Sequence, residues 1–316
     1  MARRPLAELE SAVMDPKTLL FLALAAVTVW FLAAWRWRVR TARAAGRLID
    51  DPPATGLHTL VGFAMCFFDT LGIGNFATTT SMFKLRRSVR DEWIPGTLNV
   101  AYTLPTVAQA LIYISIVRVD FLTLLTMIAA SVAGAWLGAG VVARWPRMKI
   151  QVGMGFALLA AAALMLLTQL QLVPVGGTAL ALRGPGLVAG LVGNFALGAL
   201  MTLGIGLYAP CLILVSLLGM DPRAAFPIMM GSCAFLMPIA GMRFIREGSY
   251  SLHASIVLAL AGIPAVLIAA YIVKQMPLVY VRWLVVVVVV YTAATLLRSA
   301  FVERRAPTSP GLASAR

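Results

Sequence analysis

The sequence TLGIG occurs twice in the chain, at residues 70–74 and 202–206, each time inside a long apolar segment. The similarity continues beyond the motif, because a proline follows 21 residues after the last glycine of each copy, at Pro95 and at Pro227. An internal repeat with matched positions predicts two copies of one structural unit. Duplicated apolar units that glycine interrupts near their start are typical of secondary transporters.

The composition places both copies in a membrane. Apolar residues make up 61% of the chain and charged residues 12%, and the mean hydropathy is +0.90. Several nearly charge-free runs reach the roughly 20 residues that a helix needs to cross a bilayer. None of these runs alternates apolar and polar residues as a barrel strand would. Since only helices then satisfy the backbone in lipid, we expect an all-α polytopic membrane protein.

The net charge of +14 does not indicate binding of nucleic acid. The basic residues stand in short loops between apolar runs, and there is no soluble basic domain to carry such binding. The three cysteines all lie in apolar segments and give no disulfide framework. We therefore expect the lipid bilayer as a partner, with no nucleic acid, no cofactor and no metal centre.

The second copy contains a charge-free run at 184–220, with the glycine-rich motif near its middle. This run is too long for one spanning helix and too short for two with a connection. Two arms of about 14 residues would each reach roughly 20 Å into a hydrocarbon core ~30 Å thick. The sequence therefore predicts that each copy begins with a re-entrant or broken helix hairpin.

Loop charges predict the orientation of these segments. If both hairpins enter and leave on one side, 17 loop Lys and Arg residues lie on one face of the membrane and 5 on the other, so the first face is cytoplasmic. Each unit then has one hairpin and three spanning helices, an odd number of crossings, so the two repeats are inverted relative to one another. We expect seven spanning helices and two hairpins in a bacterial-type cytoplasmic (inner) membrane, with the N-terminus outside and the C-terminus in the cytoplasm. The predicted segments are an extra N-terminal transmembrane helix with a basic cytoplasmic linker (1–50), repeat 1 (51–172), repeat 2 (173–303) and a disordered tail (304–316).

The second arm of each hairpin begins just after a glycine, at Gly74 and at Gly206. A helix N-terminus has unpaired N–H groups and a positive dipole end, and glycine lets a ligand approach the backbone closely. Two such N-termini meeting near the membrane centre would form an anion site without a fixed cation. The alternative, that the glycines only allow close packing of helices, stays open. The candidate binding residues are Gly72, Gly74, Asn75, Thr78, Thr79, Asn99, Gly204, Gly206, Cys211 and Ser232.

Asp69 is the only acidic residue within the apolar runs. A carboxylate inside a membrane is costly and indicates a functional site. Asp69 stands just before the first helix break, where it could exchange a proton that is coupled to substrate movement. It could also brace the free N–H groups nearby. Because the second copy has Met201 at this place, repeat symmetry does not require an acid, and both interpretations stay open.

Two other functions compete with anion transport. Cys211 and Cys233, with Met229 and Met230, could line a path for a soft metal, although methionine is common as a filler of apolar helices. An intramembrane enzyme is disfavoured, because the chain has one membrane aspartate rather than a pair and neither an HExxH nor a GxSxG motif. The spacing of Ala130, Gly134 and Gly138 permits close helix packing, either within one chain or in a homodimer.

These residues make the chain resemble the TauE/SafE family of membrane permeases, which is associated with sulfite export and with transport of sulfur-containing organic anions. The resemblance covers about 57–300 and rests on GIGN at 72–75, GIG at 204–206 with Pro210, LLGM at 217–220 and the helix around Gly231-Ser232. Family members more often have a richer glycine run and a proline in the first copy, so the chain resembles a divergent branch. The resemblance implies a permease, not an enzyme, for a small anion such as sulfite, a sulfonate or a related sulfur oxyanion.

Overall fold

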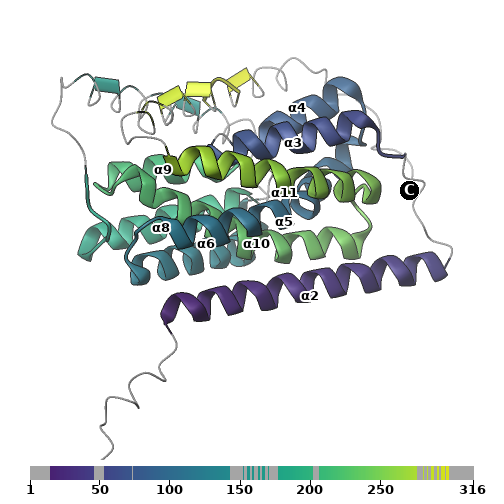
Figure 1. Ribbon diagram of the computed structural model, residues 1–316, viewed down its shortest axis with the longest axis horizontal. Coiled ribbons are helices and arrows are strands. Elements are labelled where there is room, and N and C mark those ends of the chain that lie inside the picture. Colours follow the sequence, from purple (N-terminus) through teal and green to yellow (C-terminus); the bar gives the residue numbers. More distant parts are fainter. Residues whose placement is uncertain are drawn as a thin grey trace, which may run out of the picture.

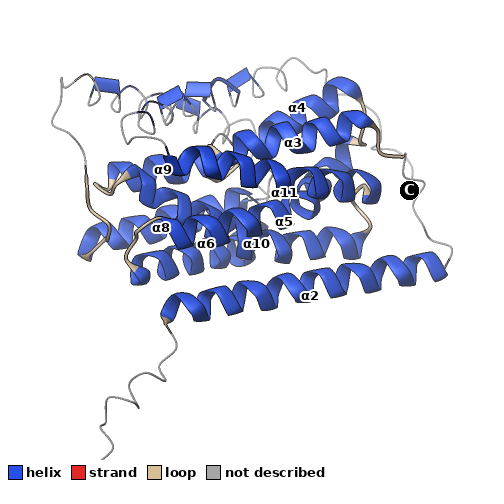
Figure 2. Cartoon of the chain, in the orientation of Figure 1, coloured by secondary structure: helices blue, strands red, loops and turns tan. Residues whose placement is uncertain are grey.

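The computed structural model describes residues 15–45, 53–72, 74–142, 177–201 and 206–275, together with single positions within 152–170 and 280–298. Within these residues the chain is helical, and the one β-type interaction is an isolated bridge between Ala179 and Met220 (Figures 1 and 2). The expected all-α class is confirmed. The third spanning helix of each unit, the basic linker at 46–50 and the tail at 304–316 lie largely or wholly outside the described residues, so the number of seven spanning helices stays a prediction.

The described helices follow the order that the repeat predicts. Among the described residues, four segments are long and apolar enough to cross a membrane, at Pro16–Ala44, Gly184–Met201, Pro222–Glu247 and Leu252–Ile272. The helices are α2 (Pro16–Ala44), α3 (Gly56–Thr70), α4 (Phe76–Arg86), α5 (Ile94–Ile116), α6 (Phe121–Val142), α8 (Gly184–Met201), α9 (Tyr208–Leu217), α10 (Ala225–Glu247) and α11 (Leu252–Gln275), with short 3-10 turns at Asp91–Trp93 and Pro222–Ala224.

Both TLGIG copies interrupt a helix, as the sequence predicts. The first interruption separates α3 from α4, and the second separates α8 from α9. At the first break, Gly72 and Gly74 have φ of 95° and 80°, a left-handed conformation that a residue with a side chain rarely adopts. The arms differ from the expected length of about 14 residues: α3 has 15 and α4 has 11, while α8 has 18 and α9 has 10.

Equivalent helices of the two units make equivalent contacts with the other unit. In each unit the first arm of the hairpin packs on the second spanning helix of the other unit, so that α3 lies on α11 and α8 lies on α6. The equivalent helices α5 and α10 pack on each other at the centre. Figure 1 shows α3 and α4 towards one end of the helical bundle and α8 and α9 towards the opposite end. The two helix breaks are thereby brought together between α5 and α10.

Glycine residues allow close packing of α6 on α8 and of α3 on α11. A Cβ atom at Gly134 of α6 would overlap the Phe195 carbonyl oxygen of α8, and a Cβ at Gly198 would overlap the Ser131 carbonyl oxygen. At the equivalent contact, a Cβ at Gly62 of α3 would lie 2.8 Å from the Leu258 Cα of α11. The sequence allowed Gly134 to pack against a helix of the same chain or of a second copy in a homodimer. In the structure Gly134 packs against a helix of the same chain.

The extra helix α2 packs against α10 and α5. Phe31 and Trp35 are buried there against Met242 of α10, and the Trp35 Nε1–H donates a hydrogen bond of 3.0 Å to the Tyr250 hydroxyl. The remaining surface of α2 is largely exposed and apolar, as in a helix that faces lipid. The N-terminal helix of the prediction is therefore present and docked onto the repeat core.

Candidate functional site

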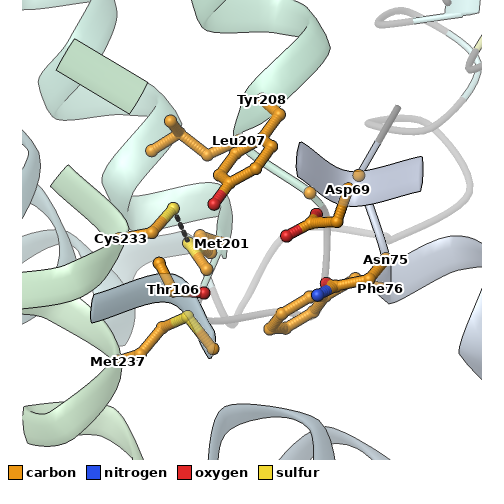
Figure 3. A pocket seen from close by; sticks show the side chains of 11 residues that line it. Asp69, Asn75, Phe76, Thr106, Met201, Leu207, Tyr208, Cys233 and Met237 are labelled. Atoms are coloured by element: carbon orange, nitrogen blue, oxygen red, sulfur yellow. Dashed lines mark hydrogen bonds between the residues drawn. The ribbon is translucent and has the colours of Figure 1, made fainter. Parts of the chain in front are cut away.

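A small cavity lies where the two helix breaks meet (Figure 3). Its volume is about 10 Å³, which is room for one water molecule. The lining residues come from both hairpins and from the two central helices. They are Asp69, Gly74, Asn75, Phe76, Thr106, Met201, Gly206, Leu207, Tyr208, Cys233 and Met237.

The two units contribute equivalent positions to this lining. Eight of the eleven residues form four pairs, and the members of each pair are separated by the same number of positions as the two TLGIG motifs. The internal repeat is thus expressed at the cavity itself, with one residue of each pair from each hairpin. The pairs are Asp69 and Met201, Gly74 and Gly206, Asn75 and Leu207, and Phe76 and Tyr208.

The first residues of α4 and of α9 both line the cavity. Asn75 is the N-cap of α4 and Leu207 is the N-cap of α9, and neither side chain caps its own helix with a hydrogen bond. The positive ends of two helix dipoles therefore converge on one space. Such N-termini attract negative charge through unpaired backbone N–H groups.

Asp69 is held at the cavity by donors from two directions. The Gln109 Nε2 of α5 donates a hydrogen bond of 2.9 Å to the Asp69 Oδ2 and another of 2.9 Å to the Thr70 Oγ1. The backbone N–H of Asn75, at the start of α4, also donates to the Asp69 carboxylate. Asp69 is buried, with 2% of its surface exposed, so these donors replace the water that the carboxylate loses.

Gln109 joins the first break to the second. Its Oε1 accepts a hydrogen bond of 2.7 Å from the hydroxyl of Tyr208, the first residue of α9. The Thr106 hydroxyl, one turn earlier on α5, also hydrogen-bonds the Tyr208 hydroxyl. Because the Gln109 amide donates towards Asp69 and accepts from Tyr208, its orientation is fixed by the network. A continuous chain of buried hydrogen bonds therefore runs between the two hairpins.

No cation balances Asp69 among the described residues at the cavity. The titratable side chains with which Asp69 interacts electrostatically are Cys66, Tyr102, Tyr208 and Cys233. These are thiols and phenols, which are ordinarily uncharged at neutral pH. The positive potential of the site thus comes from backbone N–H groups and helix ends.

Sulfur atoms gather on the side of the cavity that faces α10. The Cys233 thiol points at the Met201 sulfur at 3.5 Å, and Cys233 also interacts electrostatically with Cys211 (Figure 3). Within the part of the chain that the structure describes, no group of three His, Cys, Asp or Glu side chains could hold a metal ion. The geometry gives the soft-metal alternative no support.

Four of the residues predicted to bind the anion or carry a proton line the cavity, namely Asp69, Gly74, Asn75 and Gly206, and so does Cys233 of the soft-metal alternative. Gly72 lies beside the first break, facing the Phe226 and Met229 side chains of α10. Gly204 falls in 202–205, outside the described residues.

The other candidates lie away from the lining. The Thr79 hydroxyl is buried and pairs with the Tyr102 hydroxyl at 2.7 Å, while the Thr78 hydroxyl donates to the Asn75 carbonyl within its own helix. Asn99 donates to the Pro95 carbonyl one turn earlier, and the Ser232 hydroxyl accepts from Asn194 of α8. Cys211 is buried one turn into α9. Of these side chains, Thr79 links α4 to α5 and Ser232 links α10 to α8.

Tyr208 and Gln109 have larger roles in the geometry than sequence reasoning assigned to them. Tyr208 stands two residues after Gly206, as Phe76 stands two residues after Gly74, so the repeat itself could have identified it. Gln109 is a buried amide in a helix that is otherwise mostly apolar, which is a costly placement without partners. Its partners are 40 and 99 positions away, and no local pattern reveals such contacts.

The comparisons with known proteins give one match. The family model described as Sulfite exporter TauE/SafE matches residues 7–165, which is half of the chain. The match includes α2 and the first helix break and ends before the second unit. No curated protein and no solved structure matches the chain.

Proposed function

The chain belongs to the TauE/SafE family of sulfite exporters, and from this premise we propose that it is a secondary transporter of a small anion, with sulfite, a sulfonate or a related sulfur oxyanion as its substrate. The observation that carries the proposal is the cavity at which the N-termini of α4 and α9 converge. Helix N-termini of this kind bind anions without a fixed cation. Gly74, Asn75 and Gly206 are the predicted site residues that would meet the anion there.

Transport requires this cavity to change size. A volume of about 10 Å³ holds one water molecule and is too small for an oxyanion of several heavy atoms. We infer that the two breaks move apart to admit the anion from one side and then from the other. The two units, in inverted orientation across a bacterial inner membrane, would give equivalent openings to the two faces.

Asp69 is our candidate for proton coupling. Its carboxylate lies in the same cavity as the two helix ends, so a proton on it would change the charge that an entering anion meets. The same carboxylate also accepts the Asn75 N–H at the first break, which is the bracing role left open by the sequence. Substitution by asparagine keeps the shape and removes the proton, so it separates the two roles.

The test is sulfite efflux from proteoliposomes that contain the intact chain. We expect the Asn75→Ala variant to lower the efflux rate, because it removes the one amide side chain among the described residues that line the cavity. Ser115→Ala, which removes an exposed hydroxyl bonded only to its own helix, is the matched control and is expected to leave efflux unchanged. No sulfite movement by the intact chain would overturn sulfite as the substrate.

The Asp69→Asn variant completes this experiment. If Asp69 couples a proton, a pH gradient stops driving sulfite movement in the variant while efflux down a sulfite gradient continues. Unchanged dependence on the pH gradient would contradict the proton role and leave bracing as the function of this carboxylate.

A further inference from the structure

Among the described residues, the charges at the cavity come from one side chain and from two helix N-termini. Asp69 is the one charged side chain among the described lining residues. Residues 73 and 202–205, which also belong to the two breaks, are uncharged in the sequence. Each helix N-terminus corresponds to roughly half of a positive elementary charge, so α4 and α9 together supply about one. The site can therefore compensate about one negative charge.

When Asp69 is ionised, its carboxylate is that negative charge. It accepts the Asn75 N–H at the start of α4, which is where an anion bound by this helix end would lie. Two negative charges at these helix ends would exceed the positive charge available, and like charges that share a site oppose each other's ionisation. The carboxylate and a bound anion thus compete for the same donors.

We propose that the cavity binds a monovalent anion only with Asp69 protonated, so that each anion crosses the membrane together with one proton and the cycle moves no net charge. This inference rests on the proposed function and adds to it the charge of the substrate and the number of protons. The loaded site holds the anion and a neutral Asp69, and the empty site holds the ionised Asp69. Both states have the same charge.

Among the described side chains around Asp69, none other is expected to gain and lose the coupled proton. The titratable side chains facing it are Cys66 of α3, Tyr102 of α5, Tyr208 of α9 and Cys233 of α10. None of them supplies a positive charge or a second carboxylate. Gln109 can stay in place in both states, because a protonated Asp69 still has one oxygen that accepts the Gln109 N–H.

Voltage distinguishes this mechanism from plain anion transport. Moving one uncompensated charge through 100 mV is worth ≈ 2.3 kcal/mol, which shifts the accumulation ratio of a monoanion about 50-fold. An anion that travels with one proton is accumulated according to the pH gradient, and the membrane potential leaves its distribution unchanged.

The experiment uses the full chain in proteoliposomes, with the voltage clamped by a potassium gradient and valinomycin and with an internal pH dye. The probes are sulfite and methanesulfonate, a monoanion that does not titrate near neutral pH, so that any pH effect on it comes from the protein. We expect one proton per methanesulfonate and the same accumulation ratio at every clamped potential. A ratio that follows the potential, or uptake without protons, would overturn the inference.

Variants sharpen the result. Asp69→Asn is expected to transport without protons and to become sensitive to voltage, whereas Asp120→Asn, in the loop before α6, is expected to behave like the unaltered chain. If Asp69→Asn does not fold, the proton count and voltage response of the unaltered chain still decide. Absence of flux for both probes would overturn the proposed function, whereas flux that is driven by voltage would overturn only the coupling proposed here.

Discussion

The two helix breaks share the same arrangement of the backbone but differ in the side chains that they place at the cavity. Each break ends one helix and starts a shorter one whose N-terminus lines the cavity. The side chains at matched positions differ, since the first unit has Asp69 where the second has Met201, and Phe76 where the second has Tyr208. The repeated backbone provides the positive helix ends. The unmatched side chains provide an acceptor from one unit and a hydroxyl donor from the other.

Gln109 connects the different side chains of the two breaks. It stands between the two breaks and bonds to Asp69 on one side and to Tyr208 on the other, at 2.9 and 2.7 Å. A symmetric pair of breaks would give Gln109 two similar neighbours and no preferred orientation. The comparison can therefore be tested by making the two units alike, one position at a time.

The largest expected effect comes from Asp69→Met, which gives the first unit the residue of the second. The variant removes the only charged side chain among the described residues that line the cavity. We expect accumulation of methanesulfonate driven by a pH gradient to fall at least about tenfold, because the coupled proton has no site. Uptake of methanesulfonate into proteoliposomes under an imposed pH gradient measures this accumulation. The Asp69→Met variant and the unaltered chain are compared at equal amounts of monodisperse protein.

A similar accumulation in the Asp69→Met variant would mean that another group carries the proton. Tyr208 and Cys233, the other titratable side chains that line the cavity, would then be the next groups to test.

The glycine contacts between the units give the next largest effect. Gly198→Ala would place a methyl group against the Ser131 carbonyl oxygen, so α6 and α8 must separate. Overpacking of this kind costs about 1–3 kcal/mol. Gly186→Ala is the matched control, since it lies on the same helix with nothing within 4 Å of the added methyl group. Thermal stability in detergent, read by size-exclusion chromatography, should fall for Gly198→Ala alone.

Equal stability of the two glycine variants would show that α6 and α8 do not pack as closely as the structure has them. Gly62→Ala extends the comparison to the equivalent contact of α3 with α11, where the methyl group would meet the Leu258 backbone.

Tyr208→Phe makes the second unit like the first, which has Phe76. The variant keeps the ring and removes the hydroxyl that donates to the Gln109 Oε1. Leaving a buried acceptor without a donor costs about 1–3 kcal/mol, and the cavity provides room for a water to replace part of that loss. We expect a modest loss of thermal stability and an altered pH profile of transport, because Gln109 is then free to reorient away from Asp69.

Phe76→Tyr is the counterpart in the first unit. It adds a hydroxyl on the other side of the cavity without removing any contact to Gln109. An unchanged pH profile in Tyr208→Phe would show that the network supports the fold but does not influence Asp69.

Much of this arrangement could be predicted from the sequence because it depends on local signals. Helices, breaks and the positions of Gly74, Asn75 and Gly206 follow from apolar runs and from the repeat. The membership in the TauE/SafE family agrees with the resemblance that these motifs predict.

What the sequence could not predict depends on contacts between distant segments. The pairing of Gln109 with Asp69 requires α5 to cross the first break at one particular height. Thr79 is a predicted binding residue, and its hydroxyl pairs with the Tyr102 hydroxyl outside the lining of the cavity, a contact that its position after the break does not reveal. Helix periodicity gives the face of a residue but not the neighbour that occupies that face.

The smallest expected effect concerns the caps of two equivalent helices outside the cavity. Asp120 caps α6, accepting from the Thr123 backbone N–H at 3.0 Å and from the Thr123 hydroxyl at 2.9 Å. Ser251 caps α11, where its hydroxyl accepts from the Ala254 backbone N–H at 3.2 Å. One cap can titrate and the other cannot, so the two units should respond differently to acid.

The backbone N–H of Thr123 lowers the pKa of Asp120, and the Thr123 hydroxyl and the nearby Arg183 act in the same direction. Because the folded-state pKa lies below the unfolded one, the stabilisation is complete above the unfolded pKa and is lost as the pH falls through the folded pKa. We expect Asp120→Ala to cost at most about 1 kcal/mol near neutral pH and nothing in strong acid, since Asp120 is partly exposed. Ser251→Ala should cost about 1 kcal/mol at every pH. Detergent melting curves at several pH values measure both, and a pH-independent loss in Asp120→Ala would contradict capping by the ionised carboxylate.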